Sequence, residues 1–309
     1  MKNKTNFMTK TWVIVVGAMI CCTLWGSAFP CIKIGYRMLE IAAADTASQI
    51  LYAGYRFTLA GVLTIVLGSI LQRKILLPRR SAIGKIGLLS LLQTVLQYLF
   101  FYIGLAHTTG VKASIIEAVS TFVAILVAGY LFHQETVTSR KMLGCLIGFA
   151  GVVLVNVAGS GMDFRFSPAG DGCILLSTVA YAFSSVCMKR FSQKEDPVML
   201  SGYQFILGGI VMIACGGAMG GHLKAFTASA AALLIYMAMI SAVAYSLWGM
   251  LLKYNPVSKV TVFGFMNPVI GVILSALLLN ETESLGVSSV LALGLVCVGI
   301  YIVNAKAKE

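Results

Sequence analysis

The sequence predicts an all-α integral membrane protein in which ten transmembrane helices form two inverted repeats of five. Three observations predict this fold: the hydropathy of the chain, a long apolar segment that occurs twice, and the distribution of basic residues between alternate loops. Hydrophobic residues make up 59% of the 309 residues, charged residues only 11%, and the mean hydropathy is +0.91. Soluble domains carry about 25% charged residues, so this composition excludes an ordinary soluble protein.

The repeated segment reads GYRFTLAGVLTIVLG at residues 54–68 and GYQFILGGIVMIACG at residues 202–216. Two shorter pairs support the repeat: LFHQET with LLNET (131–136 and 278–282), and GVVLVN with GIYIVN (151–156 and 299–304). We assign residues 1–157 to the first repeat, 158–171 to a linker and 172–309 to the second repeat. Because each repeat holds an odd number of helices, the second must enter the membrane from the opposite side. Inverted repeats are typical of secondary transporters, with the substrate site near the midplane between them.

Each helix is predicted from an apolar run near the length of about 20 residues that a membrane crossing needs. The first run could pass for a signal peptide after its leading lysines, but it continues to about residue 35, which favours a retained helix. The predicted spans are 12–34, 51–71, 84–105, 113–132 and 142–157 in the first repeat, and 172–190, 198–217, 228–252, 257–279 and 285–303 in the second.

Basic residues predict the orientation of these helices. Seventeen of the 23 Lys and Arg residues fall in one set of loops, five fall in the other set, and Arg56 lies within a span. Cytoplasmic loops carry the excess of positive charge, so both termini are expected in the cytoplasm and the protein in the cell inner (cytoplasmic) membrane. The net charge of +12 therefore reports orientation, and we expect no nucleic-acid partner.

Several of these segments resemble one known family. They are LWGSAFPCIKIG in the first helix (24–35), the Glu-Thr pairs after the fourth and ninth helices (Glu135 with Thr136, Glu281 with Thr282), and the Gly-rich fifth and tenth helices. The chain resembles the EamA-type transporters of the drug/metabolite transporter superfamily, which include bacterial metabolite exporters. The resemblance implies a central cavity surrounded by helices one to four and six to nine, with helices five and ten packed outside. The family's usual proline is present in the ninth helix at Pro268, whereas the fourth helix has Ser-Thr-Phe at 120–122.

Arg56 and Glu117 are the main candidates for function, because charged groups inside spans are rare and usually functional. Each is expected about five residues inside the outer end of its helix, roughly 8 Å deep. One interpretation is a permanent ion pair that joins helices two and four. The other is a pathway in which Arg56 faces a substrate carboxylate and Glu117 faces an amine or a coupling proton.

Neutral polar side chains extend the candidate pathway. Gln93 and Gln97 share a helix face at i and i+4, where they either line the pathway or join helices by hydrogen bonds. A polar stripe in the sixth helix contains Tyr181 and Ser184, and it faces either a wet cavity or a partner helix. The aromatic candidates for ligand contact are Trp25, Tyr98 and Tyr245.

Two prolines are expected to bend their helices, because proline removes a backbone hydrogen bond. Asn267 and Pro268 would bend the ninth helix near the midplane and expose a carbonyl group, and Pro30 would bend the first helix near its outer end. A bend needed only for packing explains either proline equally well.

We expect neither a cofactor nor a metal, because the eight cysteines lie in apolar runs without paired spacing and no phosphate-binding loop is present. The leading interpretation is a secondary transporter of amino acids or related zwitterions, working by alternating access as an exporter. An intramembrane enzyme acting on a lipid or peptide is the alternative, and a ligand-sensing receptor is a third. The glycines at 144, 148 and 151 could pack helices closely within the bundle or in a homodimer through helices five and ten.

Overall fold

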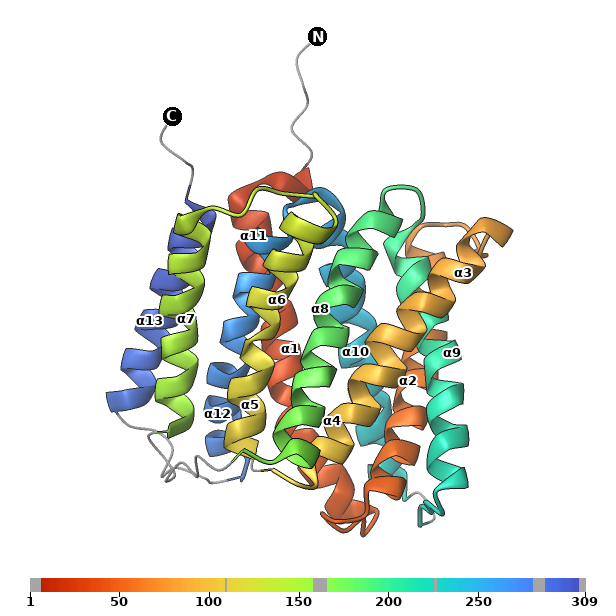
Figure 1. Ribbon diagram of the computed structural model, residues 1–309. Coiled ribbons are helices and arrows are strands. Elements are labelled where there is room, and N and C mark those ends of the chain that lie inside the picture. Colours follow the sequence, from red (N-terminus) through yellow and green to blue (C-terminus); the bar gives the residue numbers. More distant parts are fainter. Residues whose placement is uncertain (1–6, 109, 158–165, 225–226, 280–286, 306–309) are drawn as a thin grey trace.

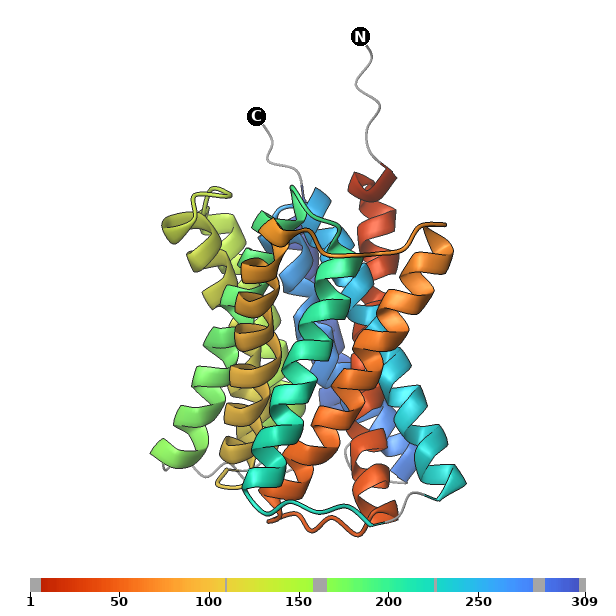
Figure 2. The same cartoon turned by 90° about the vertical axis from the view of Figure 1, so that its right-hand side faces the viewer.

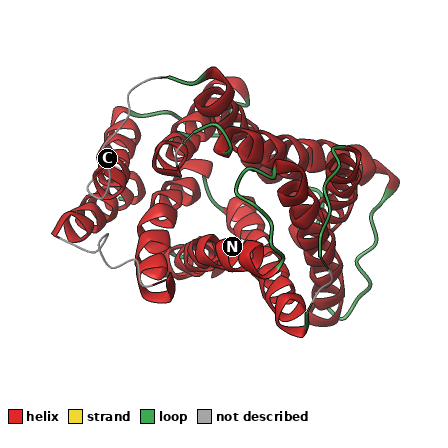
Figure 3. Cartoon of the chain, turned by 90° about the horizontal axis from the view of Figure 1, so that it is seen from below, coloured by secondary structure: helices red, strands yellow, loops and turns green. Residues whose placement is uncertain are grey.

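The computed structural model describes residues 7–108, 110–157, 166–224, 227–279 and 287–305. Within these ranges, ten helical spans are long and apolar enough to cross a membrane, and no strand is present. They stand side by side in one bundle (Figures 1 and 3). The predicted all-α fold of ten spans is therefore confirmed.

The first repeat contains five spans. Two are single helices at its start, and one closes it, whereas the third and fourth are each assembled from three helical pieces. In chain order the elements are α1 (Thr11–Met38), α2 (Thr46–Leu71), α3 (Arg80–Leu89) with the π-helical η2 (Ser90–Leu96) and α4 (Gln97–Leu105), α5 (Gly110–Ala118) with α6 (Ser120–Leu126) and the π-helical η3 (Val127–Leu131), and α7 (Ser139–Val157). A short 3₁₀ turn, η1 (Phe7–Thr9), precedes α1.

The second repeat also contains five spans, but its first span has two pieces, its third is a single helix, and only its fourth is assembled from three pieces. Its elements are the π-helical η4 (Pro168–Gly172) with α8 (Cys173–Ser192), α9 (Pro197–Ala218), α10 (Ala228–Tyr254), α11 (Val257–Thr261) with the 3₁₀ turn η5 (Val262–Phe265) and α12 (Met266–Leu279), and α13 (Val287–Asn304). Most of the expected linker (158–165) lies outside the described residues, and residues 168–171 of it already form η4.

The second span starts five residues earlier than its hydropathy predicts. The first turn of α2 is polar, and the Asp45 side chain caps it by accepting a hydrogen bond from the Ser48 backbone N–H at 3.0 Å. Hydrogen bonds from Ser48 also hold the pKa of the Asp45 carboxyl below its usual range. Arg56 is therefore ten residues into its helix, about 15 Å from its start instead of the expected 8 Å.

The two repeats run in opposite directions. The helix α1 begins, and α13 ends, on the same side of the bundle, which we call the terminal side, whereas α8 begins on the opposite side (Figure 1). The repeated glycine segments lie side by side as α2 and α9 (Figures 1 and 2). A Cβ added to Gly61 would lie 2.6 Å from the Gly202 carbonyl oxygen, and one added to Gly209 would lie 2.9 Å from that of Gly54. In the repeat, Gly54 aligns with Gly202 and Gly61 aligns with Gly209. The contact of Gly209 with Gly54 is therefore the contact of Gly61 with Gly202 with the two helices exchanged, as a two-fold axis between the repeats requires.

The helices α7 and α13 form a second pair with the same exchange, at one edge of the bundle (Figures 1 and 3). A Cβ on Gly299 would lie 2.5 Å from the Gly144 carbonyl oxygen, and a Cβ on Gly151 would lie 2.7 Å from that of Ala292. The predicted glycine stripe therefore packs helices closely within the chain.

The fourth and ninth spans both contain an interruption of the α-helix. The ninth changes from α11 through η5 to α12 just before Asn267 and Pro268, and the fourth is interrupted at Val119 without a proline. The two spans are joined there, because the Thr121 Oγ1 donates to the Thr261 carbonyl at 3.1 Å. The first span is a continuous helix through Pro30.

Candidate functional site

A central cavity of about 370 Å³ lies between the repeats, within the size range of small-molecule sites. Helices α1, α2, α4, α5 and α6 of the first repeat contribute to its wall, and so do α8, α10, α11, η5 and α12 of the second. Among the described residues, α7 and α13 contribute nothing to the lining, as the resemblance implies. The seventh span, α9, contributes no lining residue either, although the resemblance places it around the cavity, because it packs behind α2.

The cavity extends toward the opposite side of the bundle. Its lining includes Lys33 and Tyr36 in the last turns of α1, Leu105 at the end of α4, and Ala113 in the first turn of α5. Toward the terminal side the lining ends at Thr261, the last residue of α11, and at Tyr181 and Tyr245 in the interior of their helices.

Arg56 lies in the wall formed by α2, and its side chain is 3% exposed. Its Nη2 donates to the Ser241 Oγ at 3.2 Å, and its guanidinium group lies 4.7 Å from the centroid of the Phe57 ring. Its Nε is buried without a hydrogen-bond acceptor among the described residues. The cation is thus held by a hydroxyl group and an aromatic face, and it retains donor capacity for a ligand.

Glu117 lies in the wall formed by α5, and its side chain is partly exposed to the cavity. It is seven residues into the helix, about 10 Å deep, close to the expected depth. No hydrogen bond or ion pair joins its carboxylate to another described residue. Arg56 and Glu117 therefore share one cavity without forming the ion pair that would make them a permanent link between helices two and four.

Other polar atoms around the cavity also lack hydrogen-bond partners. Buried polar groups are nearly always hydrogen-bonded, so a cluster of unpaired ones indicates a place where polar ligand groups are accommodated. The lining residues with a buried, unpartnered polar atom in the described part of the chain are Trp25 (Nε1), Arg56 (Nε), Gln97 (Oε1) and Asn267 (Oδ1).

Aromatic side chains form the inner end of the cavity. The Trp25 ring lies edge-on to Tyr245 at 5.1 Å and to Trp248 at 5.0 Å between centroids. The Tyr98 and Tyr245 hydroxyl oxygens are 3.0 Å apart and share a hydrogen bond. These contacts connect α1 and α4 of the first repeat to α10 of the second.

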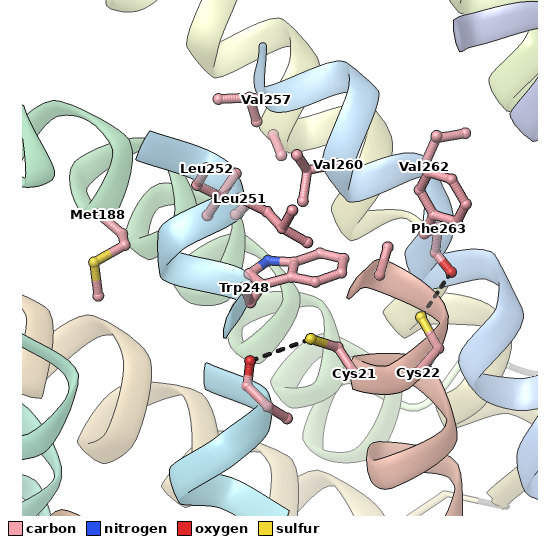
Figure 4. Close-up of a cluster of buried hydrophobic side chains, with 14 of the residues drawn as sticks. Cys21, Cys22, Met188, Trp248, Leu251, Leu252, Val257, Val260, Val262 and Phe263 are labelled. Atoms are coloured by element: carbon pink, nitrogen blue, oxygen red, sulfur yellow. Dashed lines mark hydrogen bonds between the residues drawn. The ribbon is translucent and has the colours of Figure 1, made fainter. Parts of the chain in front are cut away.

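A cluster of buried hydrophobic side chains closes the bundle on the terminal side of these aromatic rings, and we call it the terminal seal (Figure 4). The thiol of Cys21 donates to the Ala244 carbonyl at 3.3 Å, and that of Cys22 donates to the Phe263 carbonyl at 3.2 Å, so α1 is fixed to α10 and η5. The buried side chains of the seal are Cys21, Cys22, Met188, Trp248, Leu251, Leu252, Val257, Val260, Val262 and Phe263.

Nine of the twelve residues that the sequence singled out line the cavity. They are Trp25, Arg56, Gln97, Tyr98, Glu117, Tyr181, Tyr245, Asn267 and Pro268. Gln93, Ser184 and Pro30 do not.

Gln93 and Ser184 lie elsewhere for local reasons. Gln93 is in the π-helical η2, where the wider turn changes the helical phase between it and Gln97, and it is only 2% exposed. The Ser184 Oγ donates to the carbonyl of Tyr181 at 2.7 Å, so its polar atom is satisfied within its own helix.

Several lining residues were missed from sequence, although helical spacing could have found two of them. One face of α1 contributes Trp25, Ala28, Ile32 and Tyr36 at intervals of three or four residues. If Trp25 faces the cavity, this spacing predicts that Tyr36 faces it too. Thr121 follows Glu117 by four residues in the same way, although the interruption at Val119 lies between them.

Comparison with known proteins identifies the family. The model of the EamA-like transporter family matches the chain twice, over residues 12–157 and 168–305. An uncharacterized transporter of Archaeoglobus fulgidus is 28% identical over 96% of this chain and 99% of its own. The uncharacterized transporter YvbV of Bacillus subtilis is 26% identical over 92% of this chain and 89% of its own. The uncharacterized inner membrane transporter YedA of Escherichia coli is 28% identical over 92% of this chain and 90% of its own.

A solved crystal structure has the same fold. It superimposes with a TM-score of 0.77 over 94% of this chain and 96% of its own, at 15% sequence identity. The two family matches fall on the two helical repeats that surround the cavity. The chain therefore belongs to the EamA-like transporter family and is a multi-pass membrane transporter, as the resemblance predicted.

Proposed function

We propose that the protein is a secondary transporter that moves amino acids or related zwitterions across the cytoplasmic membrane by alternating access, as an exporter. Its membership of a transporter family already makes it a transporter and not an intramembrane enzyme. The substrate class, the mechanism and the direction are the parts that we propose.

The observation that supports the substrate class is the arrangement of Arg56 and Glu117 in one cavity. A small zwitterion presents a carboxylate and an ammonium group, and the cavity offers one fixed cation and one carboxylate without an ion-pair partner in the described part of the chain. A guanidinium group can bind a carboxylate through two parallel hydrogen bonds. The side chains of Gln97, Asn267 and Tyr36 supply further polar groups for the rest of the ligand.

Alternating access is supported by the inverted repeats and by the position of the terminal seal. The cavity extends to the opposite side and is separated from the terminal side by apolar packing between α1 and the helices α10, α11 and η5. Because the two repeats are related by a two-fold axis, exchanging their conformations would open the terminal side and close the other. The glycine contacts of α2 with α9 allow close helix packing along which such a rearrangement can occur.

The orientation, the location and the direction belong to the same proposal. Most Lys and Arg residues lie on the terminal side, which supports a cytoplasmic location for that side and an outward-facing cavity. The exporter assignment rests on the resemblance to metabolite exporters. A homodimer through the fifth and tenth helices would have to use the outer faces of α7 and α13, where Leu143, Leu146, Val290 and Leu291 are exposed, because the glycine faces already pack within the chain.

Counterflow in proteoliposomes tests the substrate class. Vesicles loaded with a mixture of amino acids are exposed to the same isotope-labelled mixture, and uptake is followed by mass spectrometry with and without a pH gradient. For the best substrate, we expect the analogue without the amine and the analogue without the carboxylate each to compete about 10- to 100-fold less well, because each loses one charge-assisted interaction. Equal competition by all three compounds, or no flux of any amino acid, would reject the zwitterion assignment.

A further inference from the structure

A second pocket, of about 480 Å³, lies on the terminal side, away from the central cavity. It is formed where η3, α8 and α10 end. Both repeats contribute to it, since η3 and the residues after it belong to the first repeat, and α8 and α10 to the second. Its lining residues are Leu131, Phe132, Gln134, Lys189, Arg190, Gln193 and Lys253. We call it the basic pocket.

Three cations line the basic pocket, and no described carboxylate forms an ion pair with any of them. The guanidinium group of Arg190 lies 5.7 Å from the centroid of the Phe132 ring, and the Lys253 ammonium lies 5.6 Å from that of Tyr254. Like charges gathered in a partly enclosed pocket repel one another, so an anion bound between them is stabilised.

A carboxylate that interacts with one of these cations already has other partners. Glu135 interacts electrostatically with Lys189, but its oxygens accept hydrogen bonds from the Ser258 backbone N–H at 2.9 Å, the Ser258 Oγ at 2.5 Å and the Lys141 ammonium at 2.8 Å. A second terminal-side carboxylate, that of Glu195, pairs with Lys85 at 2.6 Å. Neither lines the basic pocket.

Hydrogen bonds between the helix ends hold the Lys189 ammonium and join the backbones around it. The Lys189 ammonium donates to the carbonyl groups of Leu252, at 3.3 Å, and of Asn255. The amide group of Gln193 donates to the Lys189 carbonyl at 3.1 Å and to the Lys253 carbonyl at 2.8 Å. These bonds fix the end of α8 against the end of α10, so the pocket is preorganised.

We propose that the basic pocket binds a carboxylate or phosphate group, carried either by a soluble metabolite or by an anionic lipid. Arg190 supplies two parallel donors for such a group, and Lys189 and Lys253 add positive charge to the pocket. On the cytoplasmic side of a membrane, a basic pocket between helix ends suits an anionic headgroup equally well. The site is independent of the cargo of the central cavity.

A bound anion would affect the conformation of the transporter. It would contact η3 of the first repeat and α8 and α10 of the second in the arrangement that seals the terminal side. Because a ligand favours the state in which it makes more contacts, the anion stabilises the sealed state.

Phosphate is the probe for the soluble ligand. The thermal midpoint of the purified protein in a neutral detergent is measured over a phosphate series at constant ionic strength. We expect a saturable rise in the wild type that is lost in the double variant Arg190→Gln, Lys253→Gln. It should be retained in Lys194→Gln, which removes an exposed cation from the adjacent loop outside the pocket.

Native mass spectrometry tests whether the ligand is an anionic lipid. The same three proteins are released from nanodiscs of phosphatidylcholine with phosphatidylglycerol, and the bound phosphatidylglycerol is counted. A phosphate effect that only the double variant loses identifies a soluble ligand, and a phosphatidylglycerol molecule that only the double variant loses identifies a lipid site. Either result supports the pocket. If the double variant matches the wild type in both measurements, or if Lys194→Gln loses as much as the double variant, the proposal is wrong.

Discussion

At the scale of single residues, the account depends on how Arg56 and Glu117 are held. Arg56 is fixed by Ser241 and Phe57, and Glu117 lines the same cavity without an ion pair in the described part of the chain. A charged side chain within a membrane span is unfavourable unless a group of opposite charge or a hydrogen-bonding group binds it. A transported zwitterion can be that partner.

Substitution of the two residues tests this interpretation. We expect Arg56→Lys and Glu117→Gln each to lower kcat/KM for the transported amino acid by about 10- to 100-fold, because lysine lacks the planar pair of donors and glutamine lacks the charge. The matched control is Glu40→Gln, since Glu40 is an exposed carboxylate that pairs with Lys224 on the surface, and surface pairs contribute little. Transport assays together with thermal midpoints separate lost binding from lost folding. If both cavity variants transport at the full rate, Arg56 and Glu117 have only a packing role.

Much of the site could be predicted from residue chemistry, but its exact lining could not. Arg56 and Glu117 could be predicted because charged groups are rare in an apolar helix, and Trp25 because an aromatic ring can contact a ligand. Hydropathy does not say which face of a helix meets the cavity. Gln93 was therefore among the candidate lining residues, although a π-helical segment turns it away from the cavity, and Tyr36 was not among them.

At the scale of helices, the pairing of α2 with α9 depends on glycine. A Cβ on Gly61 would lie 2.6 Å from the backbone of both Gly202 and Ile206, and backbone atoms cannot move aside as a flexible side chain can. The two helices would have to separate to accommodate even a methyl group.

We therefore expect Gly61→Ala to lower the free energy of unfolding by about 1–3 kcal/mol, as overpacking in a core does. Gly84→Ala is the control, because a Cβ there meets nothing within 4 Å and alanine favours a helix interior by up to about 1 kcal/mol. Denaturation in detergent micelles compares the two variants. Equal stability of both would show that the close approach of α2 to α9 does not constrain the bundle.

The number and order of the spans could be predicted from hydropathy and from the repeat, whereas their irregularities could not. The interruption of the fourth span at Val119 has no proline to indicate it, and it lies next to Thr121, which bonds to the interrupted ninth span. The early start of α2 was missed because a polar first turn, capped by Asp45, lowers the local hydropathy. Both features depend on contacts that a single helix does not reveal.

At the scale of the whole molecule, the two repeats create one cavity and one seal. The cavity extends to the opposite side, and the terminal seal separates it from the side that holds most of the positive charge. If the transporter alternates, a residue of the cavity wall and a residue of the seal cannot be open to solvent at the same time. The terminal seal must then come apart whenever the opposite side closes.

Labelling of single introduced thiols from each side of the membrane, mapped by mass spectrometry, measures this directly. In Ser114→Cys the thiol lies in the cavity wall, and in Leu251→Cys it lies in the seal. We predict that an impermeant maleimide labels position 114 from the outer side while position 251 stays unlabelled, and that transport conditions raise labelling at 251 from the cytoplasmic side as labelling at 114 falls. If both positions react together in every condition, the protein is a continuous channel and the alternating-access account is wrong.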